Sequence, residues 1–356
     1  MKREKDIYSR VVESQNIYQA ILYASKRKKT RKNVREVLDN IDKCTEEVRK
    51  ILISENYIPS PYEKVKIMDG VRKKERIIYK PAFYPDQIIH WALMLQLEPI
   101  ISRGMYDYSC GAIKNRGIMY GARYVKKILV RDRKNTKYCL KLDIKKFYPN
   151  IDQSILKQKF RKILKDKKAL ALLDKIIESV ESGVPIGNYT SQWFANFFLQ
   201  DLDHFIKEQL KVKYYIRYMD DMVLFSRNKK ELHKCRIAIE EFLKKEKLTL
   251  KENWQLYKTD SRPLDFLGYR FYRGYTTLRK SNFLRIKRRI KKIYKKKKLS
   301  YTDASATISY YGWIKHCDSY NFNQKYMKPY VNLKKCKGVI RNASKNIQLR
   351  KTKKSF

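Results

Sequence analysis

The stretch that decides the fold is Tyr214-Tyr-Ile-Arg-Tyr-Met-Asp-Asp-Met-Val-Leu-Phe-Ser226, in which two apolar runs flank an acidic pair. This pattern predicts a hairpin with Asp220 and Asp221 at its tip. Adjacent carboxylates repel each other, and a tight turn has no structural need for both. A divalent cation such as Mg2+ removes the repulsion, because it takes carboxylate oxygens as ligands. The alternative is a solvated turn, since aspartate favours turns in general.

A third carboxylate, Asp143, ends a second apolar run that begins at Tyr138. The aromatic pair Phe147 and Tyr148 follows, and then Pro149 interrupts the pattern. If this strand lies beside the hairpin, three carboxylates meet at one edge of a sheet. They can then hold two metal ions about 3.5 to 4 Å apart, which stabilise the attacking and leaving oxygens of a phosphoryl transfer.

These residues resemble the catalytic motifs of reverse transcriptases. Tyr218-Met-Asp-Asp221 is similar to the catalytic box of that family, and Asp143 followed by Tyr148 is similar to its first palm motif. The resemblance implies that the three aspartates are catalytic and hold two Mg2+ ions, or Mn2+, together with the backbone carbonyl of Ile144. It also implies that Tyr148 lies beneath the incoming sugar and selects deoxynucleotides. The alternative interpretation of Tyr148 is an ordinary core aromatic.

The composition indicates a polyanionic partner. Against 36 Asp and Glu the 356 residues include 83 Lys and Arg, a formal net charge of +47. Cations neutralise phosphates, and the 28 Tyr and 14 Phe can stack on bases. No run of 18 apolar residues is present to span a bilayer, so we expect no membrane partner.

The six cysteines lack the spacing of a metal site, so we expect no structural zinc. Reduced thiols and the absence of a secretory signal favour a cytoplasmic protein. The resemblance implies that a bacterium or a phage encodes it.

The resemblance implies an α+β right-hand polymerase with fingers, a palm built on an antiparallel sheet, and a helical thumb. We expect a helical N-terminal extension at residues 1–60, fingers at 61–137 and a palm at 138–275. The palm includes a loop and helix at 183–210, and residues 276–356 form the thumb and a basic tail. In the thumb, residues 279–298 contain 12 cations and no acid, with apolar residues at helical spacing.

Alternating residues at 62–79 predict two strands around an Asp-Gly turn in the fingers. The resemblance implies that Arg76 and Lys66 bind the incoming triphosphate there. A solvated basic face is the alternative for Lys66. Lys258 matches the family's basic residue near the triphosphate, although a plain surface lysine has the same pattern. The turn Phe266-Leu267-Gly268-Tyr269 resembles the primer grip.

The next informative stretch is Gly183-Val-Pro-Ile-Gly-Asn-Tyr-Thr-Ser-Gln192. We expect Gly183 to end the preceding helix, and the residues after it to form a loop that leads to a helix capped near Thr190 or Ser191. Most reverse transcriptases have Gln before this second Gly. Here Ile186, with Ser191-Gln192, resembles the enzymes of diversity-generating retroelements. These enzymes are error-prone, chiefly opposite template adenines.

We therefore expect Ile186 and Gln192 to determine fidelity, and Gly187 and Gln192 to contact the nucleotide. An isoleucine side chain can contact the nascent base pair only by apolar packing, whereas the amide of a glutamine could form a hydrogen bond near it. The alternative is that Ile186 merely buries the loop.

The sequence thus predicts an RNA-dependent DNA polymerase that copies a template-repeat RNA into mutated cDNA by two-metal nucleotidyl transfer. Its expected partners are template RNA, primer and cDNA, dNTPs and an oligomeric accessory variability protein, as the resemblance implies. One alternative is a retron or group II intron reverse transcriptase. An alternative of a different class is a catalytically inactive RNA-binding protein.

Overall fold

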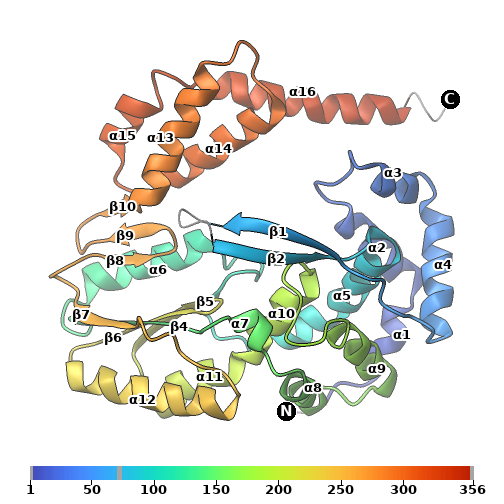
Figure 1. Ribbon diagram of the computed structural model, residues 1–356, viewed down its shortest axis with the longest axis horizontal. Coiled ribbons are helices and arrows are strands. Elements are labelled where there is room, and N and C mark those ends of the chain that lie inside the picture. Colours follow the sequence, from blue (N-terminus) through green and yellow to red (C-terminus); the bar gives the residue numbers. More distant parts are fainter. Residues whose placement is uncertain (1–2, 70–73, 353–356) are drawn as a thin grey trace. The chain divides into compact units, whose positions relative to one another are not determined.

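The computed structural model describes residues 3–69 and 74–352 (Figure 1). The chain divides into two compact units. Unit 1 contains Met1–Gly117 and Leu140–Leu256, and unit 2 contains Ile118–Cys139 and Tyr257–Phe356. Each unit combines helices with a β-sheet, in agreement with the predicted α+β class.

Helices form the N-terminal part of unit 1, as the spacing of apolar residues predicts. They are α1 (Ile7–Val11), α2 (Ser14–Ala24), α3 (Lys32–Asp39) and α4 (Ile41–Ile53). α2 packs against α4 and against the largely buried α5 (Ile88–Ser102), which follows the kinked segment η1 (Phe83–Gln87). The buried Asn16 amide donates to the Ala92 carbonyl of α5 at 3.0 Å. The N-terminal helices therefore share the core of unit 1.

The predicted hairpin at residues 62–79 is confirmed. Strands β1 (Glu63–Asp69) and β2 (Lys74–Lys80) pair antiparallel, with Asp69 opposite Lys74. Gly70, the second residue of the predicted turn, lies outside the described residues.

A five-stranded sheet has the order β3-β5-β6-β4-β7. Its strands are β3 (Ser109–Cys110), β4 (Tyr138–Asp143), β5 (Tyr214–Tyr218), β6 (Asp221–Ser226) and β7 (Gln255–Lys258). β5 and β6 form an antiparallel hairpin, and β3 runs parallel to β5. The inner residues of β5 and β6 are buried at consecutive positions, which indicates that both faces of the hairpin are covered, and all of them except Arg217 are apolar or aromatic.

Helices follow the strands of unit 1. They are α7 (Phe147–Asn150), α8 (Gln153–Ile163), α9 (Lys167–Ile177), α10 (Tyr189–Phe198), α11 (Gln200–His204), the π-helical turn η2 (Phe205–Gln209) and α12 (Lys229–Lys245). Two predicted helix boundaries are wrong. α9 ends at Ile177, well before Gly183, and the N-cap of α10 is Asn188 rather than Thr190 or Ser191. Both errors are local, because several polar residues near each end could serve as caps.

Unit 2 combines a small sheet with the C-terminal helices. Its strands β8 (Leu264–Phe266), β9 (Tyr269–Phe271) and β10 (Thr276–Leu278) have the order β10-β9-β8. Its helices are α6 (Ile118–Arg131), α13 (Lys280–Tyr294), α14 (Tyr301–Lys315), α15 (Tyr320–Tyr326) and α16 (Leu333–Thr352). The cation-rich α13 buries Ile286, Ile290 and Ile293, so the predicted helix with one apolar stripe is confirmed.

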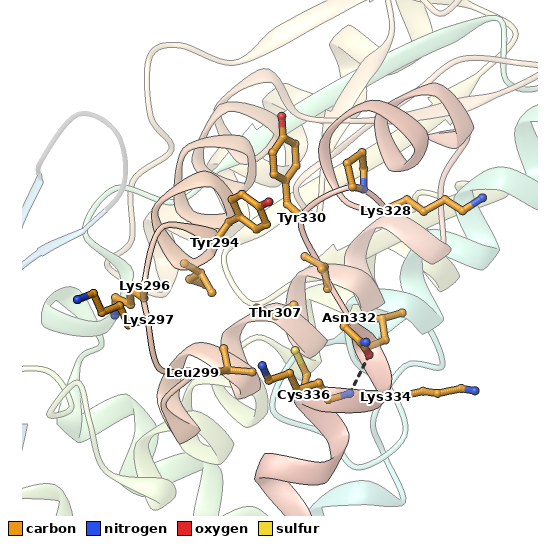
Figure 2. Close-up of a pocket in the computed structure, with 15 residues that line it drawn as sticks. Tyr294, Lys296, Lys297, Leu299, Thr307, Lys328, Tyr330, Asn332, Lys334 and Cys336 are labelled. Atoms are coloured by element: carbon orange, nitrogen blue, oxygen red, sulfur yellow. Dashed lines mark hydrogen bonds between the residues drawn. The ribbon is translucent and has the colours of Figure 1, made fainter.

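Unit 2 also contains a cavity of about 700 Å³ between the end of α13 and the start of α16 (Figure 2). The rings of Tyr294 and Tyr330 meet edge to face beside it, with centroids 5.2 Å apart. Lysines line its rim and no carboxylate does, so the cavity is cationic. Among the described residues, no helix is both long and apolar enough to cross a membrane.

Candidate active site

The sheet order brings the three predicted aspartates to neighbouring strands. Asp143 is the last residue of β4, and β4 lies next to β6. Asp221 is the first residue of β6 and pairs with Tyr218. Met219 and Asp220 therefore form the two-residue turn of the hairpin, with Met219 at a φ of 55°. The acidic pair thus sits at the hairpin tip, as the apolar flanks predict.

The carboxylates influence one another's charge. Burial, together with the negative charges of Asp143 and Asp221, raises the pKa of Asp220 to about 6. Like charges disfavour ionisation of a neighbouring carboxylate only when they are close. Asp143 therefore lies within electrostatic reach of the turn, although 77 residues separate it from Asp220 in the sequence.

Two lysines balance part of this negative charge. Lys251 Nζ donates to Asp143 Oδ2, and Lys141 Nζ lies 3.8 Å from Asp221 Oδ1. The backbone positions Lys251, because its amide donates to the Asp143 carbonyl at 2.8 Å beside a β-bridge at Ile144. Sequence reasoning missed both lysines, since neither carries a local signal in a chain with this many cations.

The donor set fits a hard divalent cation. Asp143 Oδ1 is buried and has no hydrogen-bond partner, and the available ligands are carboxylate and carbonyl oxygens, which Mg2+ prefers. In the described part of the chain, no three His, Cys, Asp or Glu side chains are grouped closely enough to hold a metal ion as they stand. Lys251 occupies the other oxygen of Asp143 in this arrangement. The assignment of the metal to the three aspartates and the Ile144 carbonyl stays a prediction.

Tyr148 interacts electrostatically with Asp220 and with Arg76 of the hairpin β1–β2. It lies on α7, and burial and the charge of Asp220 both raise its pKa, whereas the charge of Arg76 lowers it. The Tyr148 carbonyl accepts from the Val184 amide at 3.0 Å, which fixes the residue against the loop before α10. Three predicted site residues therefore lie within electrostatic reach of one another.

The loop before α10 is joined to β2. The Ile186 carbonyl accepts from the Tyr79 amide at 2.8 Å. Gly187 has a φ of +125°, and a Cβ there would come within 2.6 Å of the Tyr79 carbonyl oxygen. Only glycine allows this approach without strain. Ile186 is half-buried, so its predicted role in fidelity and the alternative of loop burial both remain compatible with its position.

Residues 71–271, more than half of the chain, match the reverse transcriptase (RNA-dependent DNA polymerase) family. The chain belongs to this family. It therefore has the predicted right-hand polymerase fold, and the match includes all three aspartates, Tyr148 and the loop before α10.

Individual relatives of this reverse transcriptase are distant. The retron Ec73 reverse transcriptase of Escherichia coli is 29% identical over 47% of this chain and 54% of its own length. The group II intron-encoded protein LtrA of Lactococcus lactis subsp. cremoris is 28% identical over 54% of this chain and 33% of its own length. Protein YkfC of Escherichia coli is 25% identical over 46% of this chain and 45% of its own length. The aligned part thus spans about half or less of each relative.

Two residues predicted to contact the nucleotide line one cavity of the reverse transcriptase. Gly187 and the exposed Gln192 border a space of about 610 Å³ within unit 1, together with Lys28 and Arg31. Tyr189, at the start of α10, stacks on Trp91 in its wall with ring centroids 3.8 Å apart. The cavity combines cations with aromatic rings, as a site for nucleotides or nucleic acid does.

The remaining predicted residues lie elsewhere. Lys66 is exposed on β1, where its Nζ lies 3.2 Å from Glu75 Oε1. Lys258 and the primer-grip residues belong to unit 2, and their nucleotide or primer contacts stay predictions. The predicted turn itself is confirmed, because Phe266 pairs with Tyr269 around Leu267 and Gly268. Its residues are buried, and Tyr269 stacks on Trp313.

Proposed function

We propose that the protein is an RNA-directed DNA polymerase that copies a template-repeat RNA into mutated cDNA in a diversity-generating retroelement. The polymerase activity is supported above all by the sheet order, which places Asp143 at the end of β4 beside the strand β6 that begins at Asp221, directly after Asp220. The retroelement type is supported by Ile186 before Gly187 and by Ser191-Gln192. The +47 charge suits a template RNA, primer and cDNA, and an oligomeric accessory variability protein completes the proposed set of partners.

In this mechanism the three aspartates and the Ile144 carbonyl would hold two Mg2+ ions, or Mn2+. Such ions, when bound, neutralise the charge that develops on the attacking and leaving oxygens. Lys251 would release Asp143 Oδ2 and so free both oxygens of that carboxylate. Tyr148 would pack beneath the deoxyribose, and Arg76, within reach of Tyr148, would bind the triphosphate.

Primer extension on an RNA template tests the polymerase activity. We expect Asp220→Asn to lower the rate about a thousandfold or more, because several kcal/mol of transition-state stabilisation are lost. Asp39→Asn, a change at an exposed helical residue, is the control and should leave the rate unchanged. Equal extension by the two variants would contradict the proposal. RNA binding without extension by the wild type would favour the inactive RNA-binding alternative.

A retron or group II intron type is the second candidate, because two of the relatives are a retron enzyme and a group II intron-encoded protein. Sequencing of the cDNA made by wild type and Ile186→Gln separates the types. The retroelement proposal predicts frequent errors opposite template adenines, and fewer of them in Ile186→Gln. A low error rate in the wild type, or an unchanged error spectrum in Ile186→Gln, would favour the second candidate.

A further inference from the structure

One buried arginine, Arg217, lies two residues before the Met219–Asp220 turn. Arg217 of β5 and Asp203 of α11 have fully buried side chains, and they form a two-pronged ion pair with N–O distances of 2.8 and 2.5 Å. Tyr215 adds a third hydrogen bond to Asp203 at 2.8 Å. A buried ion pair is weak grounds for stability, because removing both charges from water offsets most of their attraction. Stability alone therefore does not explain why this buried ion pair lies close to the candidate active site.

The other contacts of Arg217 supply that reason. Besides Asp203, its guanidinium donates to Ser109 Oγ at 2.6 Å, to Asn196 Oδ1 at 3.1 Å and to the Met219 carbonyl at 3.0 Å. A guanidinium has five N–H donors, and these five hydrogen bonds use all of them. Lysine could not reproduce this fork, since its ammonium carries three donors at one point.

Asn196 of α10 completes the network. Its amide donates to the Gly111 carbonyl at 2.9 Å and to the Gln192 carbonyl at 3.2 Å, and it lies 3.6 Å from Met219 Sδ. Asn196 thus joins the helix that carries Gln192 to the catalytic turn.

Met219 is consequently held on three sides. Its amide donates to the Cys110 carbonyl at 3.1 Å, its carbonyl accepts from Arg217, and its sulfur contacts Asn196. Its φ of 55° is uncommon for a residue with a side chain and persists only where the surroundings enforce it. Asp220 follows directly, so the conformation of Met219 sets the direction of that carboxylate.

We propose that Arg217 and Asn196 are positioning residues, which hold the Met219–Asp220 turn in its strained conformation so that Asp220 points at the reacting phosphate. The proposal rests on the proposed polymerase function. A displacement of about 1 Å at a reacting group is enough to lower a rate about a hundredfold.

The test compares Arg217→Lys and Asn196→Ala with Leu243→Ala, a core change in α12 of the same unit. Arg217→Lys keeps a charge opposite Asp203 but loses the fork, whereas Asn196→Ala leaves the ion pair in place and decides the matter if Arg217→Lys does not fold. We expect kcat for primer extension to fall about 10- to 100-fold in both variants, while KM for dNTP changes less than about threefold. Leu243→Ala should reduce the melting temperature with little change in kcat.

Hydrogen exchange gives a readout that does not depend on activity. We expect amides of residues 219–221 to exchange faster in Arg217→Lys and Asn196→Ala than in the wild type, and at the wild-type rate in Leu243→Ala. Unchanged exchange at the turn, or a loss of kcat no larger than in Leu243→Ala, would overturn the positioning role. Faster exchange in a protein whose wild type shows no polymerase activity would instead contradict the proposed function and leave the structural role of the network intact.

Discussion

The two long hairpins of unit 1 have the same secondary structure and opposite surroundings. In the hairpin β5–β6, Ile216 and Val223 are fully buried, whereas in the hairpin β1–β2, Ile67 and Ile77 are about two-fifths exposed. Each hairpin has an aspartate at or beside its turn, Asp220 and Asp69. In the buried hairpin, burial and the negative charges of Asp143 and Asp221 raise the pKa of Asp220. Burial and neighbours, rather than the turn itself, therefore distinguish a candidate catalytic aspartate from an ordinary one.

The largest expected difference between the hairpins concerns stability. Ile216→Ala should lower the free energy of unfolding by about 2 to 5 kcal/mol, because it leaves a cavity in the core. Ile77→Ala, the same change on the exposed hairpin, should lower it by less than about 1 kcal/mol. Denaturant titration of both variants measures the difference, and similar losses would show that the two hairpins are equally buried in solution.

The next effect tests where the exposed hairpin is anchored. Gly187→Ala should cost about 1 to 3 kcal/mol, because alanine at this φ is strained and its Cβ would press on the Tyr79 carbonyl. Gly117→Ala is the control, since nothing lies within 4 Å of the added Cβ there. Thermal unfolding compares the two variants. Equal melting temperatures would mean that the loop and β2 are not held together as the structure shows.

Whether a feature of this site can be predicted from the sequence depends on how far apart along the chain its interacting residues lie. Apolar runs that end in Asp143 and Asp220 are local patterns, so the strands and the hairpin turn can be predicted from them. The network around Arg217 joins residues 14, 21 and 108 positions apart, and no local periodicity encodes such contacts. An arginine inside an otherwise apolar strand was the one available signal. The contact of Lys251 with Asp143 could not be predicted for the same reason, because the two residues lie 108 positions apart in the sequence.

A smaller effect tests the charge of the buried turn. The pKa of Asp220 in the folded protein, about 6, lies above that of an unfolded aspartate. Between these two values the folded state binds more protons, so the Asp220 contribution to stability is lost as pH rises from about 4 to 6. Without divalent metal, Asp220→Asn should be more stable than the wild type by about 1 to 2 kcal/mol at pH 7.5 and equally stable near pH 4. Urea titrations at both pH values measure this.

Addition of Mg2+ at pH 7.5 provides the matching control. It should stabilise the wild type more than Asp220→Asn, because binding to the folded state alone shifts the unfolding equilibrium. A difference between the two proteins that does not vary with pH would contradict the electrostatic coupling of the three aspartates.

The smallest effect concerns the ion pair on the exposed hairpin. A double-mutant cycle on Lys66 and Glu75 should give a coupling below about 0.5 kcal/mol, because both side chains are at least half exposed. If Lys66 binds the triphosphate, Lys66→Ala should raise KM for dNTP while stability stays the same, with Lys64→Ala on the same strand as the control. A coupling above about 1 kcal/mol would indicate that the two side chains are less exposed to solvent in solution than they are in this structure.

The division of the chain has a consequence for protein synthesis. Helix α6 belongs to unit 2, yet the rest of that unit begins 118 residues after Cys139. At translation rates of about 5 to 20 residues per second, α6 waits roughly 6 to 24 seconds on the ribosome before its partner segment emerges. During that time its apolar face, which includes Val125 and Leu129, has none of its final neighbours from the C-terminal segment. We therefore expect chaperones that recognise exposed apolar segments to bind the nascent chain.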